Sequence, residues 1–260
     1  MPELPEVEAY RCLAESALHR RVVEVDAPDE WFLKGGLTPS HLGAVLVGRA
    51  FVAARRIGKL LLLDTDDGVT LGLRFGMTGR LLVDGTAGVD ELEYSSVRDE
   101  PAWDRVTLRF GDGGDLRIRD PRRLGGVVLA PEENRLGVDA RTVTLGGLAT
   151  LLGASGAPLK ARLMDQARLA GVGNLLADET LFRAGLDPAR PAGGLSPAEL
   201  RRLHRTLRAT VESLIERGGS HLGDLQAARR PGGSCPRDGT PLVRRTIGGR
   251  TTWSCPRHQR

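Results

Sequence analysis

Four residues near the end of the chain have the types and the spacing of a metal site. Cys235 and Asp238 are separated by two residues, as are Cys255 and His258, and sixteen residues lie between the two pairs. Each pair suits a tight turn, and the spacer is long enough for a two-stranded hairpin. Zinc accepts Cys, His and Asp ligands in a tetrahedral arrangement, although an oxygen ligand makes a structural site weaker than four thiolates do. The pattern predicts one structural Zn²⁺ ion here; the alternative is a metal-free hairpin with two incidental cysteines.

A second candidate site is the glycine-lined turn at residues 170–174. Gly171 and Gly173 flank Val172 and permit a turn that is closed to bulkier residues, and Asn174 is placed to cap the helix that follows. A turn of this kind at the start of a helix offers backbone N–H groups to a phosphate. The signal is weak by itself, because a Gly-x-Gly turn before a helix is common.

The basic residues are unevenly distributed along the chain. Of the 37 lysines and arginines only three are lysine, at positions 34, 59 and 160. Residues 229–260 hold eight arginines and one acidic residue, a charge of +7, which leaves −3 for the rest of the chain. Arginine suits phosphate because its planar guanidinium donates two parallel hydrogen bonds. The tail is therefore a candidate phosphate-binding element, with solvated surface arginines as the alternative.

The elements that must position these residues change in type along the chain. Residues 5–18 have the pattern of an amphipathic helix, and closely spaced β-rich runs from Val22 to about Leu129 predict an antiparallel sandwich or barrel. Residues 131–143 resemble a linker. Helical periodicity follows, most clearly after Leu195, where residues 196–199 form a capping box and a leucine stripe predicts a buried helix face that ends at Gly218.

Length and composition exclude several classes of protein. A chain of 260 residues with 40% hydrophobic residues can bury a core without help, and three cysteines suit no disulfide framework. No apolar run approaches the ~20 residues of a membrane-spanning helix. The acidic start of the chain lacks the pattern of a secretory signal. We therefore expect no membrane association and place the protein in the cytoplasm.

Six motifs in one order resemble those of the formamidopyrimidine-DNA glycosylase and endonuclease VIII family. They are the N-terminal sequence MPELPEVE, Gly58-Lys59-Leu60, Phe75-Gly76-Met77-Thr78-Gly79, Asp120-Pro121-Arg122-Arg123, Gly171-Val172-Gly173-Asn174 and the terminal cysteine segment. The resemblance covers essentially the whole chain and implies an α+β multidomain fold. The expected parts are an N-terminal antiparallel β-sandwich with flanking helices (1–130), a helix-two-turn-helix DNA-binding domain (131–228) and a zinc-finger-like β-hairpin (229–260).

The resemblance implies a base-excision-repair DNA glycosylase that also cleaves the strand, an AP lyase. The expected nucleophile is Pro2, whose secondary amine is exposed once Met1 is removed and is partly neutral at pH 7, because α-amino groups have a pKa of about 8. In the family this amine adds to C1′ of the damaged nucleotide, expels the base and forms an iminium. Glu3 matches the acid/base residue. Lys59 matches a lysine that contacts phosphate and assists proton transfer, and Arg250 matches the finger arginine that grips phosphates beside the lesion.

Seven further positions match residues that contact DNA or lie close to the nucleophile in the family. An enzyme that acts on a base inside a duplex must extrude the base and fill the gap. Met77, Arg122 and Leu124 match the gap-filling residues, and Lys160 and Asn174 match phosphate contacts. Glu6 matches an interior glutamate near the nucleophile, and Trp103 stands where a DNA-contacting histidine is usual.

Several departures from the family pattern concern the substrate. Only 15 residues separate Gly219 from Cys235, far fewer than in members whose loop closes over an everted 8-oxoguanine. Leu124 replaces a common phenylalanine, Phe75 a common leucine, and two expected zinc ligands are not cysteine. We therefore expect inefficient removal of 8-oxoguanine. Formamidopyrimidines, oxidised pyrimidines, abasic sites and bulkier adducts all stay open as substrates.

Damaged DNA is thus the expected partner, bound by a monomer. One alternative is a protein of the same fold that binds damaged DNA with little or no turnover, and another is generic nucleic-acid binding by the arginine-rich tail. The presence of Pro2, Glu3, Lys59 and Arg250 together favours the enzyme, because a pure binder has no need of a free proline amine.

Overall fold

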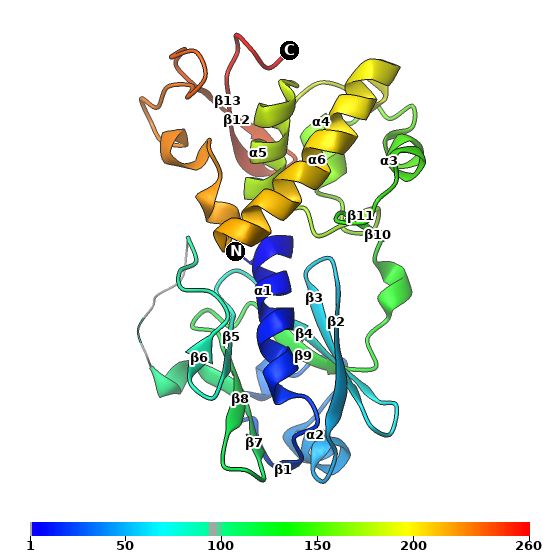
Figure 1. The fold of residues 1–260 in the computed structure, drawn as a ribbon, viewed down its shortest axis with the longest axis vertical. Helices are drawn as coiled ribbons and strands as arrows, with labels where there is room; N and C mark the ends of the chain where they lie inside the picture. The colour runs from blue at the N-terminus through cyan, green and yellow to red at the C-terminus, as the bar shows by residue number, and fades with distance from the viewer. Residues whose placement is uncertain (1, 94–97, 99) are drawn as a thin grey trace. The chain divides into compact units, whose positions relative to one another are not determined.

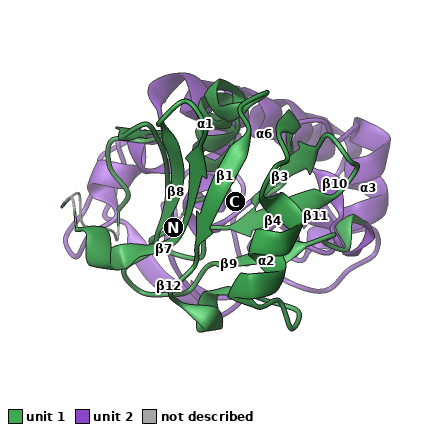
Figure 2. Ribbon diagram, turned by 90° about the horizontal axis from the view of Figure 1, so that it is seen from below, with its two compact units in different colours: residues 1–2, 6–133 green, residues 3–5, 134–260 purple. Residues whose placement is uncertain are grey.

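The computed structural model describes residues 2–93, 98 and 100–260 (Figure 1). The chain forms two compact units, coloured separately in Figure 2. Unit 1 contains Pro2 and Glu6–Glu133, and unit 2 contains Glu3–Pro5 and Asn134–Arg260. The start of the chain therefore contributes to both units.

Unit 1 is built from two antiparallel sheets. The five-stranded sheet has the order β1 (Val22–Asp26), β7 (Asp104–Phe110), β8 (Asp115–Arg119), β5 (Arg80–Val83) and β6 (Thr86–Ala87). The four-stranded sheet has the order β2 (Phe51–Ile57), β3 (Leu60–Thr65), β4 (Thr70–Arg74) and β9 (Gly126–Leu129). Helix α1 (Leu4–Ala14) and helix α2 (Pro39–Leu46) accompany the sheets. This confirms the predicted N-terminal β-sandwich with flanking helices.

One hydrophobic core joins the two sheets of unit 1. Leu61, Leu63, Leu71 and Leu73 of the smaller sheet belong to the same buried cluster as Leu81, Val106, Leu116 and Ile118 of the larger one. Alternate residues of a strand face opposite sides of a sheet, which is why the β-rich runs of the sequence predicted these strands. Tyr10 of α1 packs on Phe75 with ring centroids 4.4 Å apart, so the helix completes this core.

Unit 2 is mainly helical. It contains α3 (Leu145–Leu152), α4 (Leu159–Leu163), α5 (Asn174–Ala184) and α6 (Pro197–Arg217). A short parallel pair joins β10 (Val138–Asp139) to β11 (Leu169–Ala170), and β12 (Val243–Ile247) pairs with β13 (Arg250–Ser254) in an antiparallel hairpin. The hairpin follows the helical region, in agreement with the predicted order of elements. None of the helices in the described part of the chain is both long and apolar enough to cross a membrane.

Helix α6 matches its prediction closely, whereas two other segments differ. Ser196 and Glu199 form the capping box, the stripe is buried from Leu203 to Leu214, and the helix ends at Arg217 with Gly218 as a left-handed C-cap, φ 96°. The expected helix over residues 5–18 instead ends at Ala14 and continues as a 3₁₀ turn through Ala17. The expected linker over residues 131–143 contains a 3₁₀ turn and strand β10, because β10 pairs with the distant β11.

Candidate active site and metal centre

The carboxylate of Glu3 lies at the N-terminus of α5, inside unit 2. Its Oε1 accepts a hydrogen bond from Leu175 N at 2.9 Å, and its Oε2 accepts from Gly173 N at 2.9 Å and Leu176 N at 3.0 Å. The side chain is fully buried. The first N–H groups of a helix have no partner within the helix, and the helix dipole favours negative charge at that end. Glu3 thus supplies the cap of α5 from about 170 residues away in the sequence.

The predicted capping role of Asn174 is therefore wrong. Gly173 is the N-cap residue, and Asn174 is the first residue of α5 with no capping hydrogen bond from its side chain. A Cβ on Gly173 would lie 2.2 Å from the carboxylate carbon of Glu3, so a larger residue would displace that carboxylate from its three hydrogen bonds. The glycine is the sequence signal for this close approach. The Oδ1 of Asn174 is buried without a hydrogen-bond partner among the described residues, and its phosphate contact stays a prediction.

The side chain of Gln166 also stabilises the turn before α5. Gln166 Nε2 donates to Val172 O and to Met164 O, both at 2.8 Å, and Gln166 Oε1 accepts from Gly171 N at 3.0 Å. Gly171 has φ 109°, a conformation that favours glycine. Leu4 N donates to Gly171 O at 3.1 Å, so the start of the chain is fixed to the same turn. Sequence reasoning did not identify Gln166 as a supporting residue.

The predicted gap-filling residues are carried by two adjoining loops of unit 1. Met77 is half-buried in the loop after β4, and Arg122 and Leu124 lie exposed in the loop before β9. A Cβ on Gly76, which has φ 57°, would lie 2.4 Å from the backbone of Leu124, so the loops touch where that glycine stands. The structure thus brings these three predicted residues onto neighbouring loops.

Asp120 ties these two loops together. Its fully buried carboxylate accepts from Thr78 Oγ1, from Gly125 N at 2.8 Å and from Arg122 N at 3.2 Å. The backbone N–H of Asp120 donates to Trp103 O at 2.9 Å, which attaches the half-buried Trp103 to the same centre. Asp120 lies in one of the six motifs, but its role as a support was not predicted.

The remaining predicted residues belong to different elements of the two units. Lys59 is half-buried in the turn between β2 and β3, next to Gly58, which has φ 58°. Glu6 is buried in the first turn of α1, with 1% of its surface exposed. Pro2 is buried as well. In unit 2, Arg250 is exposed at the first position of β13, after the Gly248-Gly249 turn.

Lys160 lies in the interior of unit 2 rather than on a phosphate-binding surface. Its Nζ lies 2.7 Å from Asp178 Oδ1 and donates to Thr252 Oγ1 at 2.7 Å and Thr251 O at 3.3 Å. Asp178 also accepts from Arg229 Nη2 at 3.0 Å. The lysine is fully buried, and its ammonium group faces protein acceptors. The structure therefore places Lys160 where it fixes β13 beside Arg250, and this location does not suit the predicted phosphate contact.

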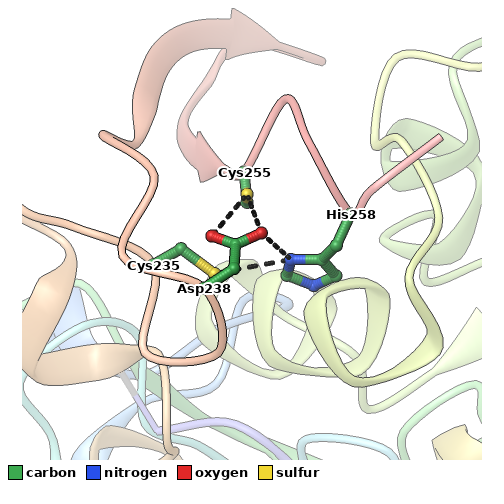
Figure 3. A group of neighbouring side chains, drawn as sticks. All are labelled: Cys235, Asp238, Cys255 and His258. Carbon is green, nitrogen blue, oxygen red and sulfur yellow. Dashed lines mark hydrogen bonds and ion pairs between the residues drawn. The ribbon is translucent and has the colours of Figure 1, made fainter.

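The four predicted metal ligands converge in the finger region, as Figure 3 shows. One donor atom from each of Cys235, Asp238, Cys255 and His258 lies within 4.8 Å of the others. Cys235 Sγ lies 3.4 Å from His258 Nδ1, and the Asp238 carboxylate oxygens lie 3.5 and 3.6 Å from Cys255 Sγ. The backbone N–H of Thr240 lowers the pKa of Asp238 to about 2, which keeps this group ionised. Two thiols, a carboxylate and an imidazole form a donor set that suits zinc.

A second contact orients the imidazole of His258. Its Nε2 lies 3.1 Å from Phe182 O, a carbonyl oxygen that can only accept, so Nε2 carries the proton. In the neutral ring the lone pair then lies on Nδ1, the nitrogen that faces Cys235. Metal-binding histidines are commonly fixed by a hydrogen bond of this kind to a carbonyl. The residues present therefore fit a metal ion, and the fixed tautomer is the feature that a metal-free hairpin would not need.

The comparisons with known proteins agree with this architecture. Residues 1–127 match the formamidopyrimidine-DNA glycosylase N-terminal domain, and residues 136–225 match the formamidopyrimidine-DNA glycosylase H2TH domain. The formamidopyrimidine-DNA glycosylase of Roseiflexus sp. (strain RS-1) is 33% identical, with 100% of both chains covered. That of Paracoccus denitrificans (strain Pd 1222) is 35% identical, with 98% of this chain and 99% of the relative covered.

Solved structures show the same fold over the whole chain. The MutM (Fpg) protein from Thermus thermophilus is 34% identical, with a TM-score of 0.81 and coverage of 99% of this chain and 98% of the other. Lactococcus lactis Fpg in complex with DNA containing Fapy-dG has a TM-score of 0.84 at 23% identity, covering 99% of this chain and 100% of the other, and shows the shared fold alone. With both domains matched in order and full-length relatives above 30% identity, the chain belongs to the formamidopyrimidine-DNA glycosylase family.

Proposed function

We propose that this protein is a base-excision-repair DNA glycosylase with AP lyase activity, and that it removes damaged bases through a Schiff base on Pro2. The observation that carries the proposal is the position of Glu3, next to Pro2 in the chain. Its buried carboxylate is held by three backbone N–H groups at the start of α5. A carboxylate and a secondary amine on consecutive residues supply the two groups that this chemistry requires.

The reaction begins at the nitrogen of Pro2 after Met1 has been removed. The nitrogen lone pair forms a bond to C1′ while the bond from C1′ to the damaged base breaks, and the base leaves with that electron pair and takes up a proton. The nitrogen then loses its proton, and its lone pair forms a second bond to C1′ while the bond from C1′ to O4′ breaks. O4′ takes up a proton, so the sugar ring opens and an iminium joins Pro2 to C1′. The iminium acidifies the 2′ proton, and its loss expels the 3′ phosphate and cleaves the strand.

Each of the other predicted residues has one task in this scheme. The ionised carboxylate of Glu3 stabilises positive charge that develops on the sugar and exchanges protons with it. Lys59 and Arg250 bind the phosphates that flank the lesion, where a charge-assisted hydrogen bond is strong. Glu6 is the interior glutamate near the nucleophile Pro2.

Binding of the lesion requires a base to leave the duplex. Met77, Arg122 and Leu124 fill the space that the extruded base leaves in the duplex. Asp120 holds the two loops that carry these residues. Trp103 offers a flat surface against the DNA, and Asn174 contacts a phosphate. Lys160 is removed from the set of direct contacts and is proposed to support Arg250 through Thr251 and Thr252.

Zinc bound by Cys235, Asp238, Cys255 and His258 would stabilise the finger that presents Arg250, with no part in the chemical steps. We propose the domain limits 1–130, 131–228 and 229–260 and a monomer that acts on damaged DNA in the cytoplasm.

Borohydride trapping on a duplex with an abasic site tests the proposal. Reduction of the iminium should give a covalent protein–DNA adduct through Pro2, and acetylation of the N-terminal amine should abolish it. Protein that retains Met1 should also give no adduct. Tight binding of the abasic duplex without any adduct would instead select the alternative, a damage-binding protein that has lost turnover.

A further inference from the structure

One face of the larger sheet in unit 1 carries three arginines in neighbouring positions. Arg80 of β5 lies directly opposite Arg119 of β8, and Leu82 lies opposite Arg117. The intervening residues Leu81 and Ile118 point into the core. The arginines therefore share the outer face, and like charges directly opposite each other destabilise a sheet. Such an arrangement needs negative charge on that face.

The three arginines line a pocket of about 250 Å³ together with Arg98. The rest of the lining is Leu82, Gly85 and Ala87, so no carboxylate of the described residues lines it. Asp104 and Asp115 pair with Arg119 and Arg117 from the sides, at 2.6 Å and 3.0 Å. These two acids balance part of the charge and hold the guanidinium groups in place.

Arg80 differs from Arg117 and Arg119 in its partners. Only 9% of its surface is exposed, and its Nη2 donates to the neutral carbonyl oxygens of Val89 at 2.6 Å and Asp90 at 2.9 Å. Its Nε is buried without a hydrogen-bond partner, and no carboxylate of the described residues forms an ion pair with it. A buried charge is costly unless it is paired, so the site around Arg80 calls for an anion.

Arg117 offers donors at the open side of the pocket. Its Nε donates to Asp115 and its Nη1 lies 3.6 Å from Asp104 Oδ2, whereas its Nη2 makes no hydrogen bond with the described residues. Its Nη2 lies 3.9 Å from the position of a Cβ on Gly85, another lining residue. Planar guanidinium groups that approach from several directions suit the tetrahedral oxygens of a phosphate better than a planar carboxylate.

We propose that this pocket binds a phosphate group, at a site separate from the residues assigned to catalysis. The group is supplied either by free phosphate or by the backbone of DNA. The chemistry is the same for both sources, and the proposal does not depend on glycosylase activity.

The test compares Arg117→Gln with the matched control Arg109→Gln. Arg109 lies on β7 of the same sheet, is half-exposed and pairs with Glu24, so both variants lose one positive charge. Calorimetric titration with inorganic phosphate at constant ionic strength gives the free-ion affinity. Binding to an undamaged duplex at several salt concentrations gives the number of phosphate contacts, because the salt slope falls by about 0.9 for each phosphate that a variant no longer binds.

A loss of at least about tenfold in inorganic phosphate affinity, confined to Arg117→Gln, identifies a free-ion site. A salt slope lower by about 0.9 in that variant alone identifies a DNA phosphate as the source. The proposal is overturned if Arg117→Gln and Arg109→Gln behave alike in both measurements. Because the duplex carries no lesion, failure of the glycosylase proposal would leave this result unaffected.

Discussion

At the scale of single residues, Glu3 combines a structural and a chemical task. The three N–H groups it accepts belong to the first turn of α5, where carboxylates are favoured by the helix dipole. The same contacts fix the side chain of the residue that follows Pro2 in the chain. A substitution of Glu3 should therefore affect both the stability of the fold and the rate of the reaction.

Glu3→Gln is expected to impair both roles. The amide keeps one acceptor oxygen but turns an NH₂ group toward backbone donors, so we expect a loss of about 1–3 kcal/mol in the free energy of unfolding. Removal of the charge should lower the single-turnover rate of base release by at least about 100-fold. Urea unfolding and a gel assay on a lesion duplex measure the two effects.

The exposed Glu15, which pairs with Arg11 on the same segment, supplies the control for this prediction. Glu15→Gln should leave both quantities close to wild type, since surface ion pairs contribute little. Equal rates for Glu3→Gln and wild type would contradict the role of Glu3.

The buried pair Lys160 and Asp178 gives a second prediction at this scale. Burial raises the pKa of Asp178 and lowers the pKa of Lys160, so each depends on the other to stay charged. Lys160→Met removes one partner and should cost about 3–5 kcal/mol in the free energy of unfolding. The double variant Lys160→Met/Asp178→Leu should recover part of that loss, and urea titration of the three proteins measures it. No recovery would show that packing rather than charge dominates at this site.

At the scale of elements, helix α6 depends on a titratable cap. Glu199 accepts from Ser196 N at 2.8 Å and pairs with Arg190, and this pairing lowers the pKa of Glu199 from 4.5 to about 2. A carboxylate whose pKa is lower in the folded than in the unfolded protein stabilises the fold at pH values above its unfolded pKa. This stabilisation is lost as the pH falls from 4.5 toward 2.

The free energy of unfolding should therefore fall by about 1 kcal/mol more in wild type than in Glu199→Gln between these pH values. Chemical unfolding at a series of pH values checks this. The exposed Glu216 near the end of the same helix provides the control, and Glu216→Gln should follow wild type. Parallel curves for wild type and Glu199→Gln would rule out the cap as the titrating group.

The finger hairpin gives a prediction about metal. Purified protein should carry about one zinc ion per chain by elemental analysis, because the four donors already converge. Removal of the ion with a chelator should loosen residues 229–260 toward protease and weaken DNA binding at the same time. Cys255→Ser should lose the metal, whereas Cys12→Ser, at an exposed cysteine outside the cluster, should retain it. A full zinc content in Cys255→Ser would contradict the ligand set.

The sequence predicted elements well where the signal was local. The strands of unit 1 and helix α6 follow from alternation, periodicity and a capping box, which depend on neighbouring residues. The cap of α5 could not be predicted in this way, because the donors at residues 173–176 and the acceptor Glu3 are about 170 residues apart. Asn174 matches the local preference for asparagine at a helix N-terminus, but the carboxylate of Glu3 caps the helix instead. Nothing in the sequence around Lys160 predicts that this lysine is buried, because its burial depends on tertiary contacts.

At the scale of the whole molecule, the segment between α6 and the finger bears on the choice of substrate. The 15 residues from 220 to 234 are not a free loop. Glu179 of α5 accepts from Asp224 N at 3.0 Å and Leu225 N at 2.9 Å. Leu225 is fully buried against Phe182 and the two finger cysteines. A segment fixed in this way cannot extend over an everted base.

We therefore expect slow excision of 8-oxoguanine, because selection of that base would need contacts that a short, anchored segment does not provide. Single-turnover assays on matched duplexes should give a rate for 8-oxoguanine at least about tenfold below that for an abasic site, a loss of about 1.4 kcal/mol in transition-state stabilisation. The abasic duplex is the internal control, since its cleavage needs Pro2 but no recognition of a base. Formamidopyrimidine and oxidised pyrimidine duplexes in the same panel identify the preferred lesion. Equal rates on 8-oxoguanine and abasic duplexes would mean that other residues recognise the base, and the exposed Leu124 would be the first to substitute, by phenylalanine and by alanine.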